Sequence, residues 1–454
     1  MNRFAISFCS LFLALLFLAP LFLAPPSLVA AGAPAADSER FWPQWRGPLA
    51  NGVAPHADPP LTWSETENVR WKVPVPGRGH GSPVVWGDRV FLLTAVASDP
   101  GDEGGVTPAG PLRFVVLAVD RRTGATLWER TAAEEVPHEG THPDGSWASA
   151  SAVTDGELVV AYFGSRGLHA YDMNGEPLWS RDFGDMATRR GFGEGSSPLL
   201  AGDLVVVNWD HEGDSFLVAL DKRDGREVWR RERDEITSWA TPLLVAEGGR
   251  QQVVVNATGR VRGYDLETGE PLWEAGGQTV NVVPSPVHGA GLVYATSGFR
   301  GSALKAIRVA GARGDLTGGD AVVWSHDRDT PYVPSPLLYG DRLYILKVNS
   351  GILTSLDAAT GEVRFGPERL PGVEGVYASP VGAAGRVYVV GRGGDTVVLR
   401  HGDAFEVLAT NHLDDTFTAS PALVDGEIFL RGFEHLYCLA EDPSPAAGQP
   451  PVAD

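Results

Sequence analysis

A Ser-Pro pair, or a close variant of it, recurs eight times along the 454-residue chain. The copies begin at Ser82-Pro83, Ser151-Ala152, Ser197-Pro198, Thr241-Pro242, Ser285-Pro286, Ser335-Pro336, Ser379-Pro380 and Ser420-Pro421. The first two copies are 69 residues apart, and the later intervals span 41–50 residues. Gly, Pro and Asp fill residues 99–111 inside the long first interval, which predicts a loop insertion there. A repeat of this period constrains the fold more strongly than any single motif.

Each unit carries the signals of four short strands in the same order. The Ser-Pro pair leads into a first strand, and a Gly-Asp turn such as 340–341 precedes a β-branched second strand. A third strand ends in an apolar residue and Asp, as at Val119-Asp120, and a Gly-containing turn leads to the fourth. Four short strands per unit predict an all-β, eight-bladed β-propeller. A seven-bladed ring is the alternative, because Phe365 and Val407 stand where other units carry Trp.

The two ends of the repeat region complement each other. A fourth-strand signature, centred on Trp71, comes before the first Ser-Pro pair, whereas the last unit ends after its third strand at 435–439. Pairing these two segments would close the ring and remove the exposed sheet edges. We therefore expect a propeller over residues 69–440, closed by the N-terminal strand near Trp71.

Tryptophan recurs in the predicted fourth strands, at Trp128, Trp179, Trp229, Trp273 and Trp324. We expect each ring to pack between neighbouring blades and to donate its N–H to a loop. The Asp that ends the third strand and the Gly after it are typical of a turn that needs a capping carboxylate and a positive φ.

The first residues of the chain differ from the repeat. Arg3 precedes an apolar run over residues 4–24, and small residues follow at 29–31, which predicts a signal peptide over residues 1–31. An uncleaved anchor is the alternative, since the run is nearly long enough to span a bilayer. We expect residues 32–68 to form an N-terminal extension and residues 441–454 a Pro- and Ala-rich tail. The mature protein would be periplasmic or secreted, with no membrane span after cleavage.

Cysteine usage and charge narrow the chemistry. Cys9 lies in the predicted signal and follows Phe8, where a lipobox needs a small residue, so we do not expect a lipoprotein. Cys438 is then the only thiol, which excludes an internal disulfide and a cysteine-based metal site. A formal net charge of −20 argues against nucleic acid or an anionic membrane as the main partner.

The unit that runs from Ser82-Pro83 to Trp128 resembles the repeat of pyrroloquinoline-quinone (PQQ) propellers. That repeat is found in quinoprotein alcohol dehydrogenases and in the BamB-type lipoprotein of the outer-membrane β-barrel assembly machinery. The opening FWPQWRGPLANGV, with WKVPVPGRGHGSPVVWGDRVF after it, is similar to a family of secreted bacterial PQQ-like proteins. The resemblance spans residues 41–440 and implies the fold rather than a function. The vicinal cysteines typical of the dehydrogenases and a lipidated cysteine are both missing from the sequence.

A ligand site is expected where two sets of propeller loops meet at one mouth of the channel. Six of the eight loops between second and third strands carry a basic residue, and aromatic residues precede the first strand in four units. Together they predict a funnel for an anionic or sugar-like ligand, or for an acidic peptide. The candidate ligand-binding residues are Trp147, Arg190, Asp210, His211, Trp239, Arg300, Tyr332, Lys347, Tyr377, Arg392 and Arg431.

Two plainer interpretations stay open. Basic residues in tight turns are often only solvated, and aromatic residues before the first strands can simply plug the channel. The polar segment 208–214 contains Asp, His and Glu, but three adjacent side chains rarely converge on one cation, so a hydrogen-bonded loop is favoured over a metal site.

The sequence thus favours a non-catalytic binding or scaffold propeller outside the cytoplasm, with no catalytic or metal-ligating residues assigned. Its partner would be an envelope protein or a small anionic or carbohydrate ligand, and we expect a monomer with no bound cofactor. The alternative is an oxidoreductase that uses PQQ, with calcium, at the channel mouth.

Overall fold

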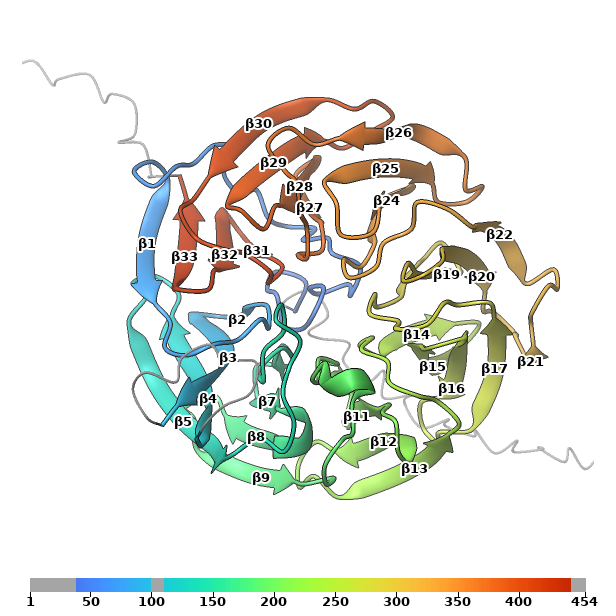
Figure 1. Cartoon of the computed structure of the whole chain (residues 1–454), viewed down its shortest axis with the longest axis horizontal. Coiled ribbons are helices and arrows are strands. Elements are labelled where there is room, and N and C mark those ends of the chain that lie inside the picture. Colours follow the sequence, from blue (N-terminus) through green and yellow to red (C-terminus); the bar gives the residue numbers. More distant parts are fainter. Residues whose placement is uncertain (1–37, 99–109, 442–454) are drawn as a thin grey trace, which may run out of the picture. The chain divides into compact units, whose positions relative to one another are not determined.

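Eight β-sheets surround a central axis and form a β-propeller (Figure 1). The computed structural model describes residues 38–98 and 110–441, so the predicted signal peptide, most of the 99–111 insertion and nearly all of the tail lie outside the described residues. The four main strands of each sheet are antiparallel and, except for the outermost strand of the closing blade, follow the chain outward from the axis, as the four strand signals per unit predict. The eight-bladed prediction is therefore confirmed over the seven-bladed alternative.

The strands occupy four concentric positions. The first, innermost strands are β2 (Val84–Trp86), β6 (Val153–Thr154), β10 (Leu199–Ala201), β14 (Leu243–Glu247), β18 (Val287–Gly289), β23 (Leu337–Tyr339), β27 (Val381–Ala383) and β31 (Ala422–Val424). The second strands are β3 (Arg89–Ala97), β7 (Leu158–Tyr162), β11 (Leu204–Trp209), β15 (Arg250–Asn256), β19 (Leu292–Ser297), β24 (Arg342–Leu346), β28 (Arg386–Val390) and β32 (Glu427–Arg431).

The third strands are β4 (Leu112–Asp120), β8 (Leu168–Asp172), β12 (Ser215–Asp221), β16 (Arg260–Asp265), β20 (Ala303–Arg308), β25 (Ile352–Asp357), β29 (Asp395–Arg400) and β33 (His435–Ala440). The outermost strands are β5 (Thr126–Glu135), β9 (Pro177–Arg181), β13 (Glu227–Arg233), β17 (Pro271–Gly276), β22 (Val322–His326), β26 (Val363–Arg369), β30 (Val407–His412) and β1 (Val69–Pro74). A short strand, β21 (Gly314–Asp315), adds to β17 in parallel, and two single turns of 3₁₀ helix, η1 (Gly164–Arg166) and η2 (Arg189–Gly191), lie in loops.

The hydrophobic core lies between the blades. The second strands are almost wholly buried, as in β7 and β24, because each is covered on both faces by a neighbouring sheet. One cluster joins Tyr294 and Leu304 of one blade to Leu343 and Leu356 of the next. The outermost strands expose most of their residues. The blades thus pack face to face, and each needs both neighbours to bury its apolar side chains.

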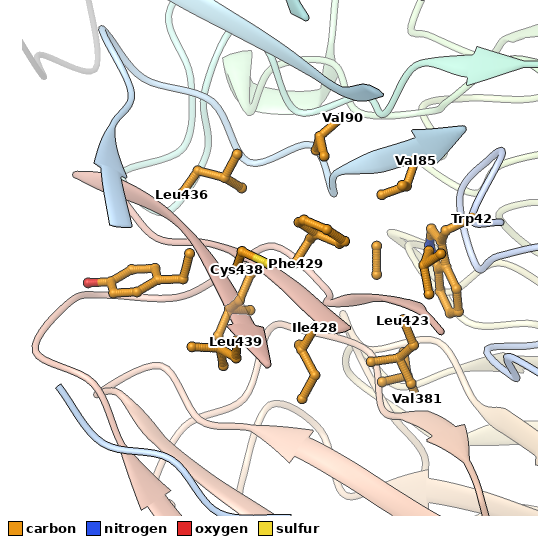
Figure 2. Close-up of a cluster of buried hydrophobic side chains, with 14 of the residues drawn as sticks. Trp42, Val85, Val90, Val381, Leu423, Ile428, Phe429, Leu436, Cys438 and Leu439 are labelled. Carbon is orange, nitrogen blue, oxygen red and sulfur yellow. The ribbon is translucent and has the colours of Figure 1, made fainter. Parts of the chain in front are cut away.

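The ring is closed by the strand that the sequence predicts. β1 pairs antiparallel with β33, from Val69 opposite Leu439 to Pro74 opposite His435. Trp71 packs against Phe429 at a ring-centroid distance of 5.9 Å. Phe429 and the buried thiol of Cys438 belong to the cluster that fills the space between the last blade and its neighbours (Figure 2). The closing blade therefore combines the two ends of the repeat region, and β33 does not remain an edge strand.

Tryptophans of the outermost strands dock onto the following blade. Five indole N–H groups donate to the carbonyl one residue after the Asp that ends the next blade's third strand. These hydrogen bonds are Trp71 to Arg121 (2.9 Å), Trp128 to Met173 (3.1 Å), Trp179 to Lys222 (2.8 Å), Trp229 to Leu266 (2.9 Å) and Trp324 to Ala358 (3.0 Å). The predicted hydrogen bond to a neighbouring blade is confirmed for Trp128, Trp179, Trp229 and Trp324, and Trp71 makes the same contact. Trp273 instead donates to Gln252 of its own blade, at 2.7 Å.

The turn glycine of the acceptor blade completes this contact. At Gly175, which has φ +84°, a Cβ atom would lie 2.6 Å from the Trp128 ring. The same clash would occur at Gly225 against Trp179, at 2.5 Å. Glycine is required here twice over, by the left-handed backbone and by the indole that covers it.

The Ser-Pro repeat has a second structural role at the axis. The backbone N–H of each Ser or Thr of the pair donates to the hydroxyl of the equivalent residue in the next blade. The donor–acceptor pairs are Ser82–Ser151, Ser151–Ser197, Ser197–Thr241, Thr241–Ser285, Ser285–Ser335, Ser335–Ser379, Ser379–Ser420 and Ser420–Ser82, at 2.8–3.1 Å. We call these eight residues the hydroxyl ring. The last bond returns to the first blade, so the ring is closed at its centre as well as at its rim.

The N-terminal extension lies against the propeller. Trp42 forms a β-bridge with Val85 of β2, and Val53 forms one with Gly382 of β27, on another part of the ring. Trp42 is buried in the cluster that spans the closing blade. Residues 42–53 therefore cross between the innermost strands of two blades.

Candidate functional site

A cavity of about 230 Å³ lies on the axis, inside the hydroxyl ring. Six of the eight ring hydroxyls line it, and its walls come from the loops between outermost and innermost strands. The aromatic residues and histidines of its wall are Trp45, His80, His142, Phe192, Trp239, Tyr332 and Tyr377. Its volume corresponds to roughly eight water molecules. The cavity is thus the size of one small ligand with polar and aromatic surroundings.

The ring hydroxyls are oriented by the backbone. Each oxygen accepts an N–H from the preceding blade, and within the described residues none of the eight donates its own O–H to a protein atom. A hydroxyl with one lone pair occupied still carries a donor. The cavity is therefore surrounded by O–H groups that are available to an acceptor.

Trp45 lines the cavity from the N-terminal extension and is fixed to the hydroxyl ring. Its indole N–H donates to Ser285 Oγ at 3.0 Å. The next residue, Arg46, is 2% exposed, and its guanidinium donates to the carbonyl oxygens of Pro336 and Pro380, both at 2.8 Å. These prolines directly follow two ring serines, so a buried cation lies just behind the ring.

Arg46 has no carboxylate within ion-pair distance among the described residues. Burial lowers the pKa of its guanidinium to about 9. Arg431 is in the same situation: it is 2% exposed, donates to the carbonyl of Leu93, and burial lowers its pKa to about 9 as well. Two buried guanidinium groups near the axis thus lack a carboxylate in the described part of the chain.

His80 lines the cavity, and Arg431 lies against the preceding residue, Gly79. Its ring stacks on Phe433 at a centroid distance of 5.0 Å, and its Nε2 is buried with no hydrogen-bond partner in the part of the chain that the structure describes. Burial, together with the charges of Arg78, Arg431 and Arg392, lowers the pKa of His80 to about 3. The imidazole is therefore neutral at physiological pH, in surroundings that are positive.

Asp144 connects opposite walls of the mouth. It lies in the long loop 136–152 between β5 and β6, and it accepts a hydrogen bond from Tyr377 (2.9 Å) on the far side of the ring. Its other oxygen pairs with Arg392 at 2.5 Å. Burial opposes ionisation, but the bonds from Arg392 and Tyr377 outweigh it and hold the pKa of Asp144 below its usual value. The loop is thus held across the mouth by a charged contact.

A second long loop, residues 182–198, meets the first. The backbone N–H of His142 donates to the carbonyl of Phe192 at 3.1 Å, and the two rings meet edge to face. Glu194 of this loop also lines the cavity; it accepts hydrogen bonds from Ser165, while burial raises the pKa of its carboxyl. Glu194 is therefore a buried carboxyl of the cavity wall that is held in place by Ser165.

Four of the predicted site residues belong to this mouth. Trp239, Tyr332 and Tyr377 line the cavity, and Arg392 lies beside it through Asp144. Trp147 is nearby, but its indole donates to Glu139 O and lines a separate, smaller pocket.

The structure does not gather the other candidates around the cavity. Asp210 is buried in an ion pair with Arg233 at 2.7 Å, and His211 accepts the backbone N–H of Ala187, so the 208–214 segment is a hydrogen-bonded loop. Lys347 pairs with Asp329 at 2.8 Å. The remaining three are Arg190 and Arg300, both exposed with positive φ, and Arg431, which is buried behind the wall. A basic residue at the same position in several loops does not imply that all of them point the same way.

Three features of the site were missed from the sequence. The Ser-Pro pair predicts only the start of a strand, although a hydroxyl at the same position in every blade also indicates a shared ring. Asp144 and Trp45 lie outside the repeat, and nothing in their local sequence marks them as neighbours of the axis. No group of three or more His, Cys, Asp or Glu side chains that could hold a metal ion occurs in the described residues.

Comparison with known proteins agrees with this architecture. The family described as outer membrane protein assembly factor BamB matches residues 113–366, more than half of the chain. The chain belongs to the BamB family. No protein of curated function matches it. Within residues 38–98 and 110–441, no helix is long and apolar enough to cross a membrane.

Solved structures similar to this BamB-family chain share its fold. BamB from Moraxella catarrhalis is 16% identical, with a TM-score of 0.52 over 76% of this chain and 100% of that one. A quinohemoprotein alcohol dehydrogenase from Comamonas testosteroni is 11% identical, with a TM-score of 0.63 over 92% of this chain and 83% of that one. A computationally designed protein, Ika8, is 13% identical, with a TM-score of 0.53 over 84% of this chain. A fold shared by an assembly factor, an enzyme and a design does not by itself assign an activity.

Proposed function

We propose that this BamB-family chain is a non-catalytic binding propeller that works outside the cytoplasm and presents its loop face to a protein of the cell envelope. One observation carries the proposal: the two long loops, 136–152 and 182–198, converge over the axial mouth and leave aromatic rings partly exposed around it. Trp147, Trp239, Tyr332 and Tyr377 are all partly buried there. Large aromatic side chains that are held in place but still reach solvent are the usual anchors of protein interfaces.

The polar groups of the mouth support binding rather than chemistry. The carboxylate of Asp144 is engaged by Tyr377 and Arg392, and that of Glu194 by Ser165. His80 is held neutral, so it cannot act as a general acid near pH 7. In the described part of the chain, the mouth therefore has the features of a shaped surface rather than of an acid–base pair.

A quinone-dependent oxidoreductase is the alternative, and the cavity supports it less well. PQQ is a fused tricyclic quinone with three carboxylates, whereas the cavity wall already contains two carboxyl groups, those of Asp144 and Glu194. The cavity's volume of about 230 Å³ also suits a smaller molecule. We infer no reaction step through this cofactor.

Face-specific photo-crosslinking tests the binding proposal. A photoreactive phenylalanine would replace Tyr332 at the mouth or, as the control, Arg223, an exposed residue in the β12–β13 turn at the other end of the ring. With an envelope fraction, we expect a discrete adduct from position 332 that excess unlabelled protein competes away. Equal labelling from position 223, or none from position 332, would refute the proposal.

A second measurement addresses the alternative. The purified protein would be mixed with PQQ and Ca²⁺ and assayed for dye-linked oxidation of alcohols and sugars. We expect no turnover. Stoichiometric quinone binding with turnover would replace the binding proposal by the oxidoreductase.

A further inference from the structure

The axial cavity combines three features that point to a small negatively charged ligand. Its wall carries O–H donors from six members of the hydroxyl ring, its surroundings contain two buried guanidinium groups, and its sides are aromatic. This combination is independent of the protein partner proposed above, because it concerns the inside of the ring rather than its surface.

The charges near the cavity do not cancel. Asp144 and Glu194 both line the cavity. Asp144 is paired with Arg392 and Glu194 accepts hydrogen bonds from Ser165, whereas the buried Arg46 and Arg431 have no carboxylate within ion-pair distance among the described residues. Arg46 bonds to the carbonyls directly behind two ring serines, and Arg431 lies against Gly79, next to His80 of the cavity wall. A buried guanidinium without a counter-ion is costly, so an anion near both of them would be stabilised.

The hydroxyl ring supplies the direct contacts. Because the backbone N–H groups occupy one lone pair of each ring oxygen, the O–H bonds are left for an acceptor inside the ring. Carboxylate oxygens accept such bonds strongly, since hydrogen bonds to an ionised acceptor are shorter and stronger than neutral ones. The Nε2 of His80 adds one more buried polar atom without a partner in the described chain.

The size and lining of the cavity restrict the anion further. Its volume of about 230 Å³ exceeds what a monatomic ion needs, and Trp45, Trp239 and Tyr332 offer apolar faces. Two carboxyl groups, those of Asp144 and Glu194, already line the cavity, so a singly charged carboxylate suits it better than a multiply charged group. We propose that the axial cavity binds a small organic carboxylate, with its charged end on the hydroxyl ring and its apolar body against these three rings.

Calorimetry with an acid and its neutral amide tests the charge requirement. Phenylacetate and phenylacetamide have nearly the same shape, and both would be titrated into the full-length protein, with tryptophan fluorescence as a second readout. We expect phenylacetate to bind and the amide to bind at least about tenfold more weakly. Equal affinities, or no heat from phenylacetate at millimolar concentration, would overturn the proposal.

A filled-cavity variant places the binding on the axis. A Cβ at Gly195, in the cavity wall, would make ordinary contacts at 3.4 Å to Trp239 and 3.8 Å to Ser149, so Gly195→Leu fills the space without a backbone penalty. Gly319→Leu is the matched control, because Gly319 is exposed and its Cβ would lie 3.5 Å from the nearest atom, Leu316 O. We expect Gly195→Leu to weaken phenylacetate at least about tenfold and Gly319→Leu to leave it unchanged. Undiminished binding in Gly195→Leu would overturn the axial location.

Two further experiments test the role of Arg431 and ask whether the bound carboxylate belongs to a peptide C-terminus or to a free small acid. Arg431→Gln should weaken phenylacetate and leave the amide unchanged, and an unchanged affinity for phenylacetate would overturn the role of the buried charge. A tetrapeptide that ends in Phe, with a free or an amidated C-terminus, distinguishes a peptide terminus from a free small acid. Binding of the free peptide alone assigns the site to a chain end; binding of phenylacetate alone assigns it to a free acid.

Discussion

The hydroxyl ring allows a quantitative prediction about what joins the blades. Ser335 is 2% exposed, and its hydroxyl accepts the backbone N–H of Ser285 at 2.9 Å. Ser335→Ala would leave that N–H buried without an acceptor, which costs about 1–3 kcal/mol. Ser335→Thr keeps the hydroxyl, and Thr241 already fills the equivalent position in another blade. We therefore expect a loss of about 1–3 kcal/mol for the alanine variant and little loss for threonine.

A second ring residue, Ser285, tests whether the loss of unfolding free energy follows the number of N–H groups that a hydroxyl accepts. Ser285 Oγ accepts two N–H groups, those of Thr241 and Trp45, both at 3.0 Å. Ser285→Ala should therefore lose roughly twice as much stability as Ser335→Ala. Ser180→Ala, on the solvent-exposed part of β9, is the control and should change stability by less than about 0.5 kcal/mol.

The assay is urea unfolding followed by tryptophan fluorescence and far-UV circular dichroism. The comparison is valid where both probes give one transition with the same dependence on urea. If Ser335→Ala unfolds with the same free energy as Ser180→Ala, or if Ser335→Thr loses as much as Ser335→Ala, then the ring hydroxyls do not hold the blades together.

Three other perturbations have expected outcomes. The side chain of Glu235 is 1% exposed, and burial raises the pKa of its carboxyl to about 7, so the folded state loses stability as the pH rises from about 4.5 to about 7. Over that range Glu235→Gln should become more stable relative to the wild type by up to about 3 kcal/mol, and a pH-independent difference in unfolding free energy would contradict this. Trp71→Ala removes the indole that seals the closing strand and should cost about 3–5 kcal/mol, with early proteolytic cleavage next to β1 as the readout; cleavage elsewhere first would argue against it. Gly184→Ala should lower the free energy of unfolding by about 1 kcal/mol because of its φ of +92° alone. Gly175→Ala should lower it further, because the new Cβ would also lie 2.6 Å from the Trp128 ring; equal melting temperatures for the two variants would refute the docking role of Gly175.

The architecture could be predicted from the sequence because the same strand pattern occurs in eight units of the repeat. The period gave the blade count, the alternating strand signals gave the order, and the spare strand at Trp71 gave the closure that the pairing with β33 confirms. Each of these features depends on local pattern and chain order, both of which are visible in one sequence.

The site was harder to predict because it depends on contacts between blades. Tyr377 and Asp144 are 233 residues apart, and only the folded ring brings them within 2.9 Å. Similarly, Arg392 and Lys347 occupy equivalent loops, but one pairs across the mouth with Asp144 and the other with Asp329 in a neighbouring loop. Which way a loop side chain turns is decided by a partner that the repeat does not specify.

The pairing of β1 with β33 has a consequence for how the molecule assembles. Val69 and Leu439 are 370 residues apart, whereas strands within one blade are joined by short turns. Bringing the two ends together costs about 2 kcal/mol more chain entropy than closing a segment of one repeat length, by the logarithmic dependence on loop length. The last blade should therefore be the slowest to form and the first to open, and the other blades can fold before β1 pairs with β33. A protease or a competing strand that acts during this interval would meet an open arc with two unpaired edges instead of a closed ring.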